Sequence, residues 1–482
     1  MRARTIRRFI AATTASGAFL WTHGSPIGSA SPDRAAAPPP ASSGPPSVVL
    51  IVTDDHRADT LRFMPNVRRL LVGQGIRFDA GYVVNPVCCP SRATALTGQY
   101  SHSTGVYTNR ASRSHGGFPA FRDDSTVATW LQAAGYRTAL IGKYLNGYGR
   151  GTSAYVPPGW DRWFVTFGDG GYFDYSASVD GRVVRFGSDA SDYGTTVLRR
   201  EAVSFIRASD ASQPLFLLWA PHAPHAPAIP ARRDRSAYPS LEPWRPTSYD
   251  EEDVTDKPAH VATRPTLDAD ERASLDAFRL GQIRSLHSVD RSVAAIMEAL
   301  DATGRLGNTM IVFTSDNGML WGEHRLQGKS EVYEEAISVP FVVRFDPLID
   351  EPRTDDHLVL NLDLAPTFAD LAGVAAPGAE GRSLLPLLAS SDGRWRTSFL
   401  IEHLGLDGGR RAPTFCAIHT RRSVFVRYAT GEEELYDLAR DPHQMTNRAG
   451  WTRYASLRRK LLAELRTLCD PQPPGADLFA RG

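Results

Sequence analysis

Four apolar runs, rich in β-branched and aromatic residues, each stop abruptly at a cluster of polar residues. They cover residues 48–52, 138–141, 215–219 and 310–313. Continuous apolar runs of this length are typical of strands that are buried on both faces of a parallel sheet. Ligand-binding groups collect beyond the carboxyl ends of such strands. The pattern therefore predicts that the four polar clusters meet in one crevice.

Segments with helical spacing of apolar residues separate these strands, as at 127–134, 195–207 and 275–300. This order of strands and helices predicts a doubly wound α/β fold, in which helices flank a mostly parallel central sheet. We assign residues 47–394 to this large domain.

The pattern changes from about residue 395 to short alternating strands, which we predict at 415–419, 423–428 and 433–438. A segment with helical spacing follows at 454–468. We therefore expect a small C-terminal α+β subdomain over residues 395–482, with an antiparallel sheet and one covering helix.

The N-terminus has the features of a secretory signal. A start rich in arginine precedes an apolar stretch at 9–20 and a small-residue cleavage site at 28–30, which predicts a signal peptide over residues 1–30. Residues 31–46, rich in Pro, Ala and Ser, form a flexible leader in this interpretation. Residues 7–10, Arg-Arg-Phe-Ile, are similar to part of a twin-arginine signal, so this route and the general secretory route both stay open.

No later apolar run approaches the roughly 18 residues that a membrane span needs. We therefore expect a secreted, periplasmic or cell-surface protein without stable membrane association. The 482 residues carry a formal net charge of +1 and no long block of like charge, which argues against a nucleic acid partner. An anionic substrate would have to be captured locally.

Two pairs of oxygen-bearing residues indicate a metal site. Asp54 and Asp55 follow the first apolar run, and their carboxylates would repel each other unless a cation or hydrogen-bond donors lie between them. Asp316 and Asn317 follow the fourth run. Each pair alone is common in turns, but their matching positions favour a metal. An all-oxygen set suits Ca²⁺, with Mg²⁺ as the alternative, better than zinc.

The loop over residues 85–92 contains Cys88 and leads into a helix that we expect to start near Pro90, where the helix N-terminus favours an anion. Arg92 adds a bidentate partner for sulfate or phosphate oxygens. The sulfur of Cys88 is a poor ligand for a hard cation. Arg92 lies four positions after Cys88, which does not fit the Cys-x5-Arg loop of cysteine phosphatases. The chemistry needs oxygen where the gene encodes sulfur.

Lysine usage points to two further residues. Only four of the 54 Lys and Arg residues are lysines, and lysine persists best where a compact ammonium group cannot be replaced by a guanidinium. Lys143 and Lys329 each follow a glycine near the polar clusters. His222 and His225 stand in a proline-bounded loop after the third run, a rigid mount of the kind that a general acid needs. We choose His225, with His222 as the second choice.

These motifs resemble a known family. Residues 88–98 match the Cys-x-Pro-Ser-Arg-x-x-x-x-Thr-Gly signature of the type I sulfatases, the formylglycine-dependent members of the alkaline phosphatase superfamily. Residues 135–143 match the second sulfatase signature, and further motifs follow in family order to about residue 345. Residues 143–149 and 156–160 are most similar to the branch of N-acetylglucosamine-6-sulfatases and extracellular heparan sulfatases.

The resemblance implies that a formylglycine-generating enzyme oxidises Cys88 to formylglycine, and that the hydrated aldehyde attacks a sulfate monoester. The substrate would be a sulfated sugar, such as a 6-O-sulfated glucosamine, or an aryl sulfate. The implied metal ligands are Asp54, Asp55, Cys88 in its modified form, Asp316 and Asn317. The implied catalytic residues are Cys88, Arg92, Lys143, His225 and Lys329. The expected substrate contacts are Lys143, His225, Lys329 and Asn146.

The chain departs from the family pattern at Leu145, where many sulfatases carry a histidine. Asn146 replaces that histidine as the expected contact, and His324, near Lys329, would either orient the site or be structural. If Cys88 is converted, Cys416 and Cys469 remain as the natural disulfide pair of an exported protein, which leaves Cys89 as a buried thiol.

Two other functions stay open. A phosphonate monoester or phosphodiester hydrolase of the same superfamily would use the same aldehyde and metal. A sulfated-glycan binding protein would keep the anion-binding residues with Cys88 unconverted, because sites and not folds determine function. Residues 160–200 and 228–275 are expected to form the walls that select the substrate.

Overall fold

The computed structural model of the protein describes residues 44–149, 151, 154–168, 171–405 and 411–479. The predicted signal peptide over residues 1–30, and all but the last three residues of the predicted leader, lie outside the described residues. None of the helices in the described ranges combines the length and the apolar character that crossing a membrane requires.

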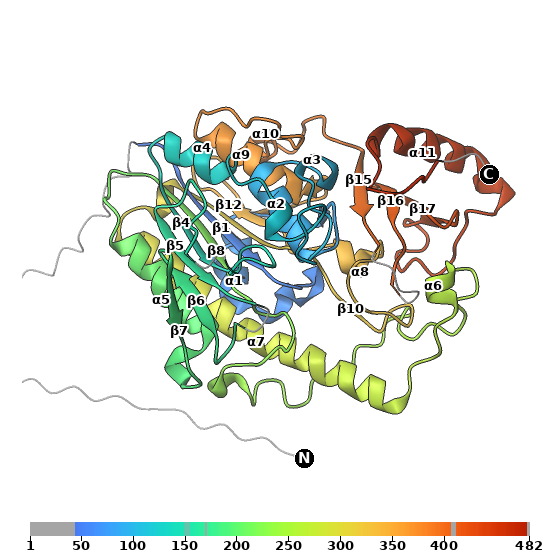
Figure 1. Cartoon of the computed structure of the whole chain (residues 1–482), viewed down its shortest axis with the longest axis horizontal. Helices are drawn as coiled ribbons and strands as arrows, with labels where there is room; N and C mark the ends of the chain where they lie inside the picture. The colour runs from blue at the N-terminus through green and yellow to red at the C-terminus, as the bar shows by residue number, and fades with distance from the viewer. Residues whose placement is uncertain (1–43, 150, 152–153, 169–170, 406–410, 480–482) are drawn as a thin grey trace, which may run out of the picture. The chain divides into compact units, whose positions relative to one another are not determined.

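A ten-stranded mixed sheet forms the centre of the fold (Figure 1). Its five middle strands pair in parallel, whereas β12, β6 and β7 run antiparallel to their neighbours. In sheet order the strands are β13 (Arg353–Asp355), β2 (Ile76–Phe78), β12 (Val342–Arg344), β9 (Thr309–Ser315), β1 (Ser47–Thr53), β8 (Leu215–Ala220), β4 (Arg137–Gly142), β5 (Arg162–Thr166), β6 (Ser176–Val179) and β7 (Arg182–Arg185). The predicted fold class is confirmed.

The alternation of side chains along the central strands divides the core into two parts. In β1, Val48 and Leu50 face one hydrophobic core, and Val49 and Ile51 face the other, because successive side chains of a strand point to opposite faces. Helices cover both faces of the sheet (Figure 1). The first core is covered by α2 (Cys88–Thr97), α4 (Val127–Ala133) and α9 (Leu364–Leu371), and the second by α1 (Pro65–Leu70), α5 (Gly194–Arg207) and α7 (Ala269–Ala302).

The four predicted central strands and three predicted helices are all present, with small shifts at their ends. Helix α7 begins before the predicted range because Asp268 caps it, its side chain accepting a hydrogen bond from the backbone N–H of Glu271 at 2.8 Å. Helix α2 begins at Cys88, two residues before Pro90. Short strands such as β2 and β12 were not predicted, since three residues are too few to show a periodic pattern.

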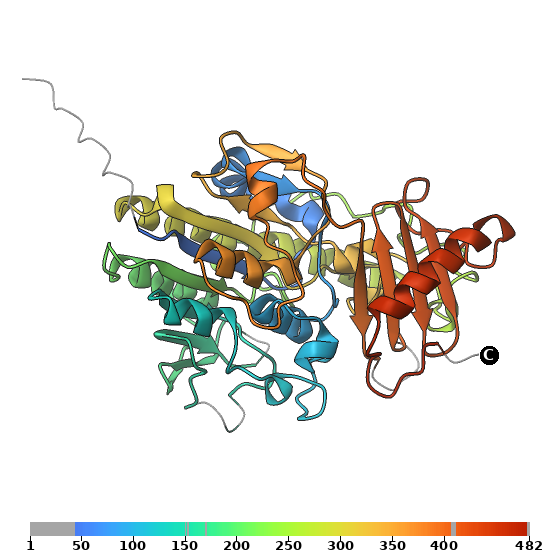
Figure 2. The same cartoon turned by 90° about the horizontal axis from the view of Figure 1, so that it is seen from above.

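A second, four-stranded antiparallel sheet follows in the C-terminal region. Its strands are β15 (Ser398–His403), β16 (Phe415–Thr420), β17 (Ser423–Tyr428) and β18 (Glu433–Asp437). Helix α11 (Ala455–Leu468) lies across one face of this sheet (Figure 2). A disulfide joins Cys416 in β16 to Cys469 at the end of α11. The predicted pairing is confirmed, and Cys89 is a buried free thiol as expected.

His102, in the short helix α3 (Ser101–Thr104), connects the large domain to this C-terminal sheet. Its Nδ1 lies 2.9 Å from a carboxylate oxygen of Glu402 in β15, and its Nε2 lies 3.2 Å from Glu380. Burial disfavours the charged ring, but the hydrogen bonds with Glu380 and Glu402 outweigh burial and raise the pKa of His102 to about 10. The ring is therefore a cation at neutral pH.

We expect His102→Gln to lower the free energy of unfolding by about 2 kcal/mol at pH 6 and by much less above pH 10. A histidine whose pKa is raised on folding stabilises the protein in full below its ordinary pKa, and the contribution is lost as the pH rises through the folded-state pKa. Urea unfolding of both proteins at pH 6 and pH 10.5 measures this difference. An equal effect of the substitution at both pH values would contradict the role of the charge.

Candidate active site

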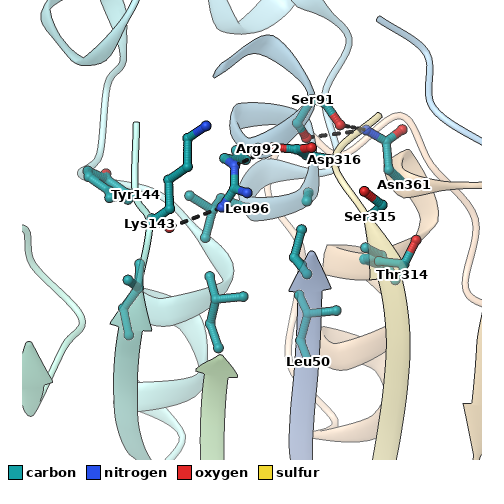
Figure 3. Close-up of a pocket in the computed structure, with 15 residues that line it drawn as sticks. Leu50, Ser91, Arg92, Leu96, Lys143, Tyr144, Thr314, Ser315, Asp316 and Asn361 are labelled. Carbon is teal, nitrogen blue, oxygen red and sulfur yellow. Dashed lines mark hydrogen bonds and ion pairs between the residues drawn. The ribbon is translucent and has the colours of Figure 1, made fainter. Parts of the chain in front are cut away.

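The polar clusters that follow the central strands lie together at the carboxyl edge of the sheet. Thr53, the last residue of β1, pairs in register with Ser315, the last residue of β9, so the residues that follow both strands are neighbours. Figure 3 shows Lys143, Arg92 and Asp316 near the ends of these strands. The crevice predicted from the four apolar runs is therefore present.

Cys88 is the first residue of α2 and is 0% exposed. Its Sγ lies 3.4 Å from Oδ1 of Asp54, 4.0 Å from Oδ1 of Asp55 and 2.6 Å from Nζ of Lys329. Burial, together with the carboxylate of Asp316, raises the pKa of the Cys88 thiol. These surroundings disfavour a thiolate, so the position suits an oxygen nucleophile better than a sulfur one.

The two lysines singled out in the sequence both lie in this site. Nζ of Lys143 is 2.5 Å from Oδ2 of Asp54, and Nζ of Lys329 contacts Oδ1 of Asp55. Burial alone would raise the pKa of Asp54, but Lys143, His225 and Arg92 hold it well below its usual range. Asp54 is therefore ionised.

The other two lysines lie outside this site, and their surroundings differ from each other. Lys257 is buried and pairs with Glu251 at 3.2 Å and with Asp256 at 2.7 Å. Lys460 is exposed on α11. The rarity of lysine therefore pointed to two residues of this site. Lys257 is a third lysine with a structural reason, because it is buried among carboxylates.

Arg92, on α2, connects the residues that follow two strands, β9 and β4. Its Nε donates to Oδ2 of Asp316 at 2.7 Å, and its Nη1 donates to the carbonyl oxygen of Lys143 at 3.1 Å (Figure 3). Its buried Nη2 has no hydrogen-bond partner among the described residues. Nη2 also lies 4.0 Å from Oδ2 of Asp54. Nη1 keeps a second N–H, so the bidentate contact with an anion that the sequence predicts stays a prediction.

His225 and His222 differ in their surroundings. Nε2 of His225 lies 3.6 Å from Oδ2 of Asp55, and its Nδ1 donates to the carbonyl oxygen of Ala226 at 2.7 Å. Since a carbonyl oxygen only accepts, Nε2 is the nitrogen that can exchange a proton in the site. Burial lowers the pKa of His222 to about 3, aided by Lys143. His222 is therefore neutral, and His225 is the better candidate for an acid.

The oxygen atoms of the site suit a hard metal ion, while the thiol of Cys88 and the imidazole of His225, which lie beside them, do not belong to the predicted all-oxygen set. Ligand atoms of four residues lie within 4.8 Å of one another, namely Asp54, Asp55, Cys88 and His225. Nδ2 of Asn317 donates to Asp55 at 2.7 Å, while its buried Oδ1 has no hydrogen-bond partner in the described part of the chain. A buried, unpartnered amide oxygen beside two carboxylates is what an oxygen-coordinated cation would satisfy. Asp316 is also adjacent, since its Oδ1 accepts from the backbone N–H of Asp55 at 3.2 Å.

The two remaining candidates, Asn146 and His324, differ in their surroundings. Asn146 lines a cleft of about 820 Å³ that also contains Lys143. His324 is fully buried, with Nδ1 2.6 Å from Glu251 and its ring stacked on Tyr333 at 4.2 Å. Its ring lies in a buried polar cluster, so the structural alternative is the better one for His324.

Sequence reasoning missed residues that hold the site together. Nε2 of Gln282 in α7 donates to the carbonyl oxygens of Asp55 at 3.3 Å and Pro224 at 3.1 Å. Nδ2 of Asn361 donates to Oγ of Ser91 at 2.9 Å (Figure 3). Gln282 could have been found as a polar residue on the apolar face of its predicted helix. Asn361 has no comparable signal in the sequence.

Of the predicted walls, only residues 166–168 and 173–176 line the 820 Å³ cleft, and no residue of 228–275 does. Residues 109–111 and 144–149 also line the cleft. The sequence pointed to the second segment through Asn146 and gave no indication of the first. The cleft lies beside the ammonium group of Lys143 and is large enough for a sugar.

Two known protein families match most of this chain. The sequence model named Sulfatase matches residues 46–374, and the model named N-sulphoglucosamine sulphohydrolase, C-terminal, matches residues 322–470. The chain belongs to the sulfatase family.

Two similar proteins have different lengths. The extracellular sulfatase SULF-1 homolog of Drosophila melanogaster is 35% identical over 366 residues, covering 73% of this chain and 32% of that protein. The N-acetylglucosamine-6-sulfatase of Homo sapiens is 31% identical over 425 residues, covering 79% of this chain and 76% of that protein. The chain thus spans about a third of the Drosophila protein and about three quarters of the human one.

Solved structures share the fold. A protein solved in complex with its substrate, D-glucosamine-2-N,6-O-disulfate, superposes with a TM-score of 0.74 at 25% identity, over 88% of this chain and 98% of that one. The phosphonate monoester hydrolase of Agrobacterium radiobacter superposes with a TM-score of 0.71 at 21% identity, over 88% of this chain and 96% of that one. At this lower identity, the second likeness shows the fold alone.

Proposed function

We propose that the protein hydrolyses a sulfate monoester to an alcohol and inorganic sulfate, with a formylglycine made from Cys88 as the nucleophile. The observation that carries the proposal is the position of Cys88, whose side chain contacts Asp54 and Lys329 within an otherwise oxygen-rich site. Membership of the sulfatase family implies both the formylglycine and a metal ion.

Calcium is the metal that we propose, with magnesium as the alternative. The residues that would hold it are Asp54, Asp55, Asp316, Asn317 and residue 88. When bound, the ion supplies Lewis-acid stabilisation of negative charge next to the nucleophile.

The other site residues have separate tasks in this proposal. Lys143 and Lys329 bind sulfate oxygens and stabilise the charge that develops on them, since both ammonium groups already lie within the carboxylate cluster. Arg92 positions Asp316 and the backbone of Lys143. A proton on Nε2 of His225, or on Lys329, passes to the ester oxygen as the S–O bond to the alcohol breaks. As that bond breaks, one hydroxyl oxygen of the hydrated aldehyde at residue 88 forms the new bond to sulfur. Loss of the proton from the other hydroxyl of residue 88 then breaks the C–O bond to the sulfate group, which releases sulfate and restores the aldehyde.

The substrate class that we propose is a sulfated sugar, such as a 6-O-sulfated glucosamine. The 820 Å³ cleft beside Lys143 has room for a sugar ring, and Asn146 offers it an amide group. Similar proteins named N-acetylglucosamine-6-sulfatase support this class.

A panel of four substrates tests the proposed activity: a 6-O-sulfated N-acetylglucosamine, an aryl sulfate, a phosphonate monoester and a phosphodiester. We expect kcat/KM to be highest for a sulfate ester. A higher kcat/KM for the phosphonate or the phosphodiester would assign the protein to the other branch of its superfamily.

Maturation can be tested separately from turnover. We propose that a formylglycine-generating enzyme acts on this chain and that the protein is exported, because the Cys416–Cys469 disulfide requires an oxidising compartment. We expect the tryptic peptide of residues 78–92, from protein made in its native host, to carry the aldehyde mass. An intact thiol in that peptide would favour the glycan-binding alternative.

Removing the metal should abolish most of the activity. We expect dialysis against EDTA to lower kcat by about 100-fold or more, and to lower the melting temperature, because Asp54 and Asp55 lose their shared cation. Activity assays and thermal unfolding before and after addition of Ca²⁺ or Mg²⁺ measure both effects and identify the preferred ion. Full activity after chelation, with an unchanged melting temperature, would contradict the metal site.

A further inference from the structure

We propose that a second cavity, of about 110 Å³, binds an additional anionic group of the substrate, either a sulfate or a carboxylate, and that Arg411 is its principal contact. The inference rests on the proposed sulfatase function and restricts the class of substrate. The substrate would then be a saccharide with at least two anionic groups, only one of which is hydrolysed.

The cavity adjoins the reacting residues. Val87, which precedes Cys88, and Ser330, which follows Lys329, both line it. The backbone N–H of Ser330 donates to the carbonyl oxygen of Pro86 at 3.0 Å, so the two loops are tied together at this point. A group held here is therefore close to a sulfate ester at Cys88.

The opposite wall comes from the C-terminal region. His403 is the last residue of β15, and Leu404 and Arg411 follow it in the chain. Asn109 and Arg110 form a third side, and Oδ1 of Asn109 accepts a hydrogen bond from the backbone N–H of Cys89 at 2.8 Å. The cavity is thus built by segments that are anchored to α2 and to the second sheet.

The charge of the lining suits an anion. Two arginines line the cavity, and no aspartate or glutamate does. His403, also in the lining, is neutral because burial lowers its pKa to about 4. Both Arg110 and Arg411 are exposed, and neither forms an ion pair with a carboxylate of the described residues. Many other arginines do, as Arg245 does with Asp276 at 2.7 Å. Two unpaired guanidinium groups facing one small cavity would attract a sulfate or a carboxylate.

The lining also contains buried polar groups. His403 is 5% exposed, and its Nδ1 has no hydrogen-bond partner in the described ranges. Tyr107, which is 2% exposed, also lines the cavity and brings its hydroxyl to it. Buried polar groups are normally hydrogen-bonded. A ligand with several acceptor oxygens would accept hydrogen bonds from the tyrosine hydroxyl and the arginines together.

Size and position identify the part of the substrate that binds. The cavity has about one seventh of the volume of the 820 Å³ cleft, so it admits a charged substituent and not a second sugar ring. Asn109 and Arg110 line both spaces. A sugar in the large cleft can therefore extend an anionic group past Arg110 towards Arg411.

The test compares four sulfate esters that differ in their second charge. They are 4-nitrophenyl sulfate, glucosamine 6-O-sulfate, glucosamine 2-N,6-O-disulfate and a disaccharide of a uronic acid with 6-O-sulfated glucosamine. We expect Arg411→Ala to raise KM about tenfold for a substrate with the second anion, and to leave kcat/KM for the first two substrates within about twofold. Arg459→Ala, which removes another exposed arginine from the same region, is the matched control and should change none of these values.

The pattern of losses distinguishes the two sources of the anion. If Arg411→Ala raises KM only for the disulfate, the cavity binds a sulfate. If it raises KM only for the disaccharide, the cavity binds a carboxylate. Equal losses for all four substrates, or no loss for any, would overturn the inference. If the wild-type protein hydrolyses no sulfate ester, the proposed function fails by itself. Calorimetry with the disulfate and with the disaccharide then decides about the cavity, since Arg411→Ala should weaken the binding of at least one of them about tenfold. Unchanged binding of both would refute the inference.

Discussion

Cys88→Ala protein is expected to lose sulfate-ester hydrolysis by a factor on the order of 10⁶, as when a covalent nucleophile is removed from other hydrolases. The side chain of residue 88 is in contact with Asp54 and Lys329, and alanine can supply neither an aldehyde nor a hydroxyl group. Single-turnover and steady-state assays on a sulfate ester measure the loss. The fold should persist, because a buried cysteine is replaced by a smaller apolar residue.

Cys89→Ala is the matched control for this substitution. Cys89 is adjacent in sequence, equally buried and also a free thiol, but it packs in the hydrophobic core with Ala93 and Leu96. We expect this variant to lose about 1 kcal/mol of stability and to keep its activity. Equal loss of activity from both substitutions would show that Cys88 is not the converted residue.

The second large effect is expected from Lys143→Arg, which keeps the positive charge. We expect kcat to fall by about 100-fold to 1000-fold. The side chain of Lys143 is 5% exposed, with Nζ 2.5 Å from Asp54. A planar guanidinium is larger than an ammonium and would displace either Asp54 or the neighbouring Arg92.

Lys460→Arg is the control, since Lys460 is exposed on α11 and the exchange is the same. It should leave both kcat and the melting temperature unchanged. Steady-state kinetics at saturating substrate, together with thermal unfolding, separate a catalytic defect from a folding defect. Wild-type kcat in Lys143→Arg would refute the argument that this position requires a compact ammonium group.

The central part of the fold could be predicted because its signal is local. Each of the strands β1, β4, β8 and β9 is a continuous apolar run, and burial on both faces requires such a run. The carboxyl ends of parallel strands share one edge, so Asp54 and Asp316 could be placed together without a structure. The strands β12 and β13 contain three residues each and depend on pairing with β2, which a local pattern does not contain.

The details of the site depended on contacts between distant segments. The orientation of Arg92 is set by Asp316 and by the carbonyl oxygen of Lys143. The sequence near Arg92 does not indicate where its side chain points. Arg411 is one of many arginines in the sequence. Its place beside residues 87 and 330 follows only from the packing of the second sheet.

The complete burial of Cys88 implies that its oxidation precedes folding. Its side chain is 0% exposed at the start of α2, where the active site of another enzyme cannot reach it. The oxidation that we propose must therefore be finished while this segment is still extended, before the sheet and α2 close around it. A molecule that folds before oxidation would keep the thiol of Cys88. The yield of active protein would therefore depend on the rate of oxidation relative to the rate of folding.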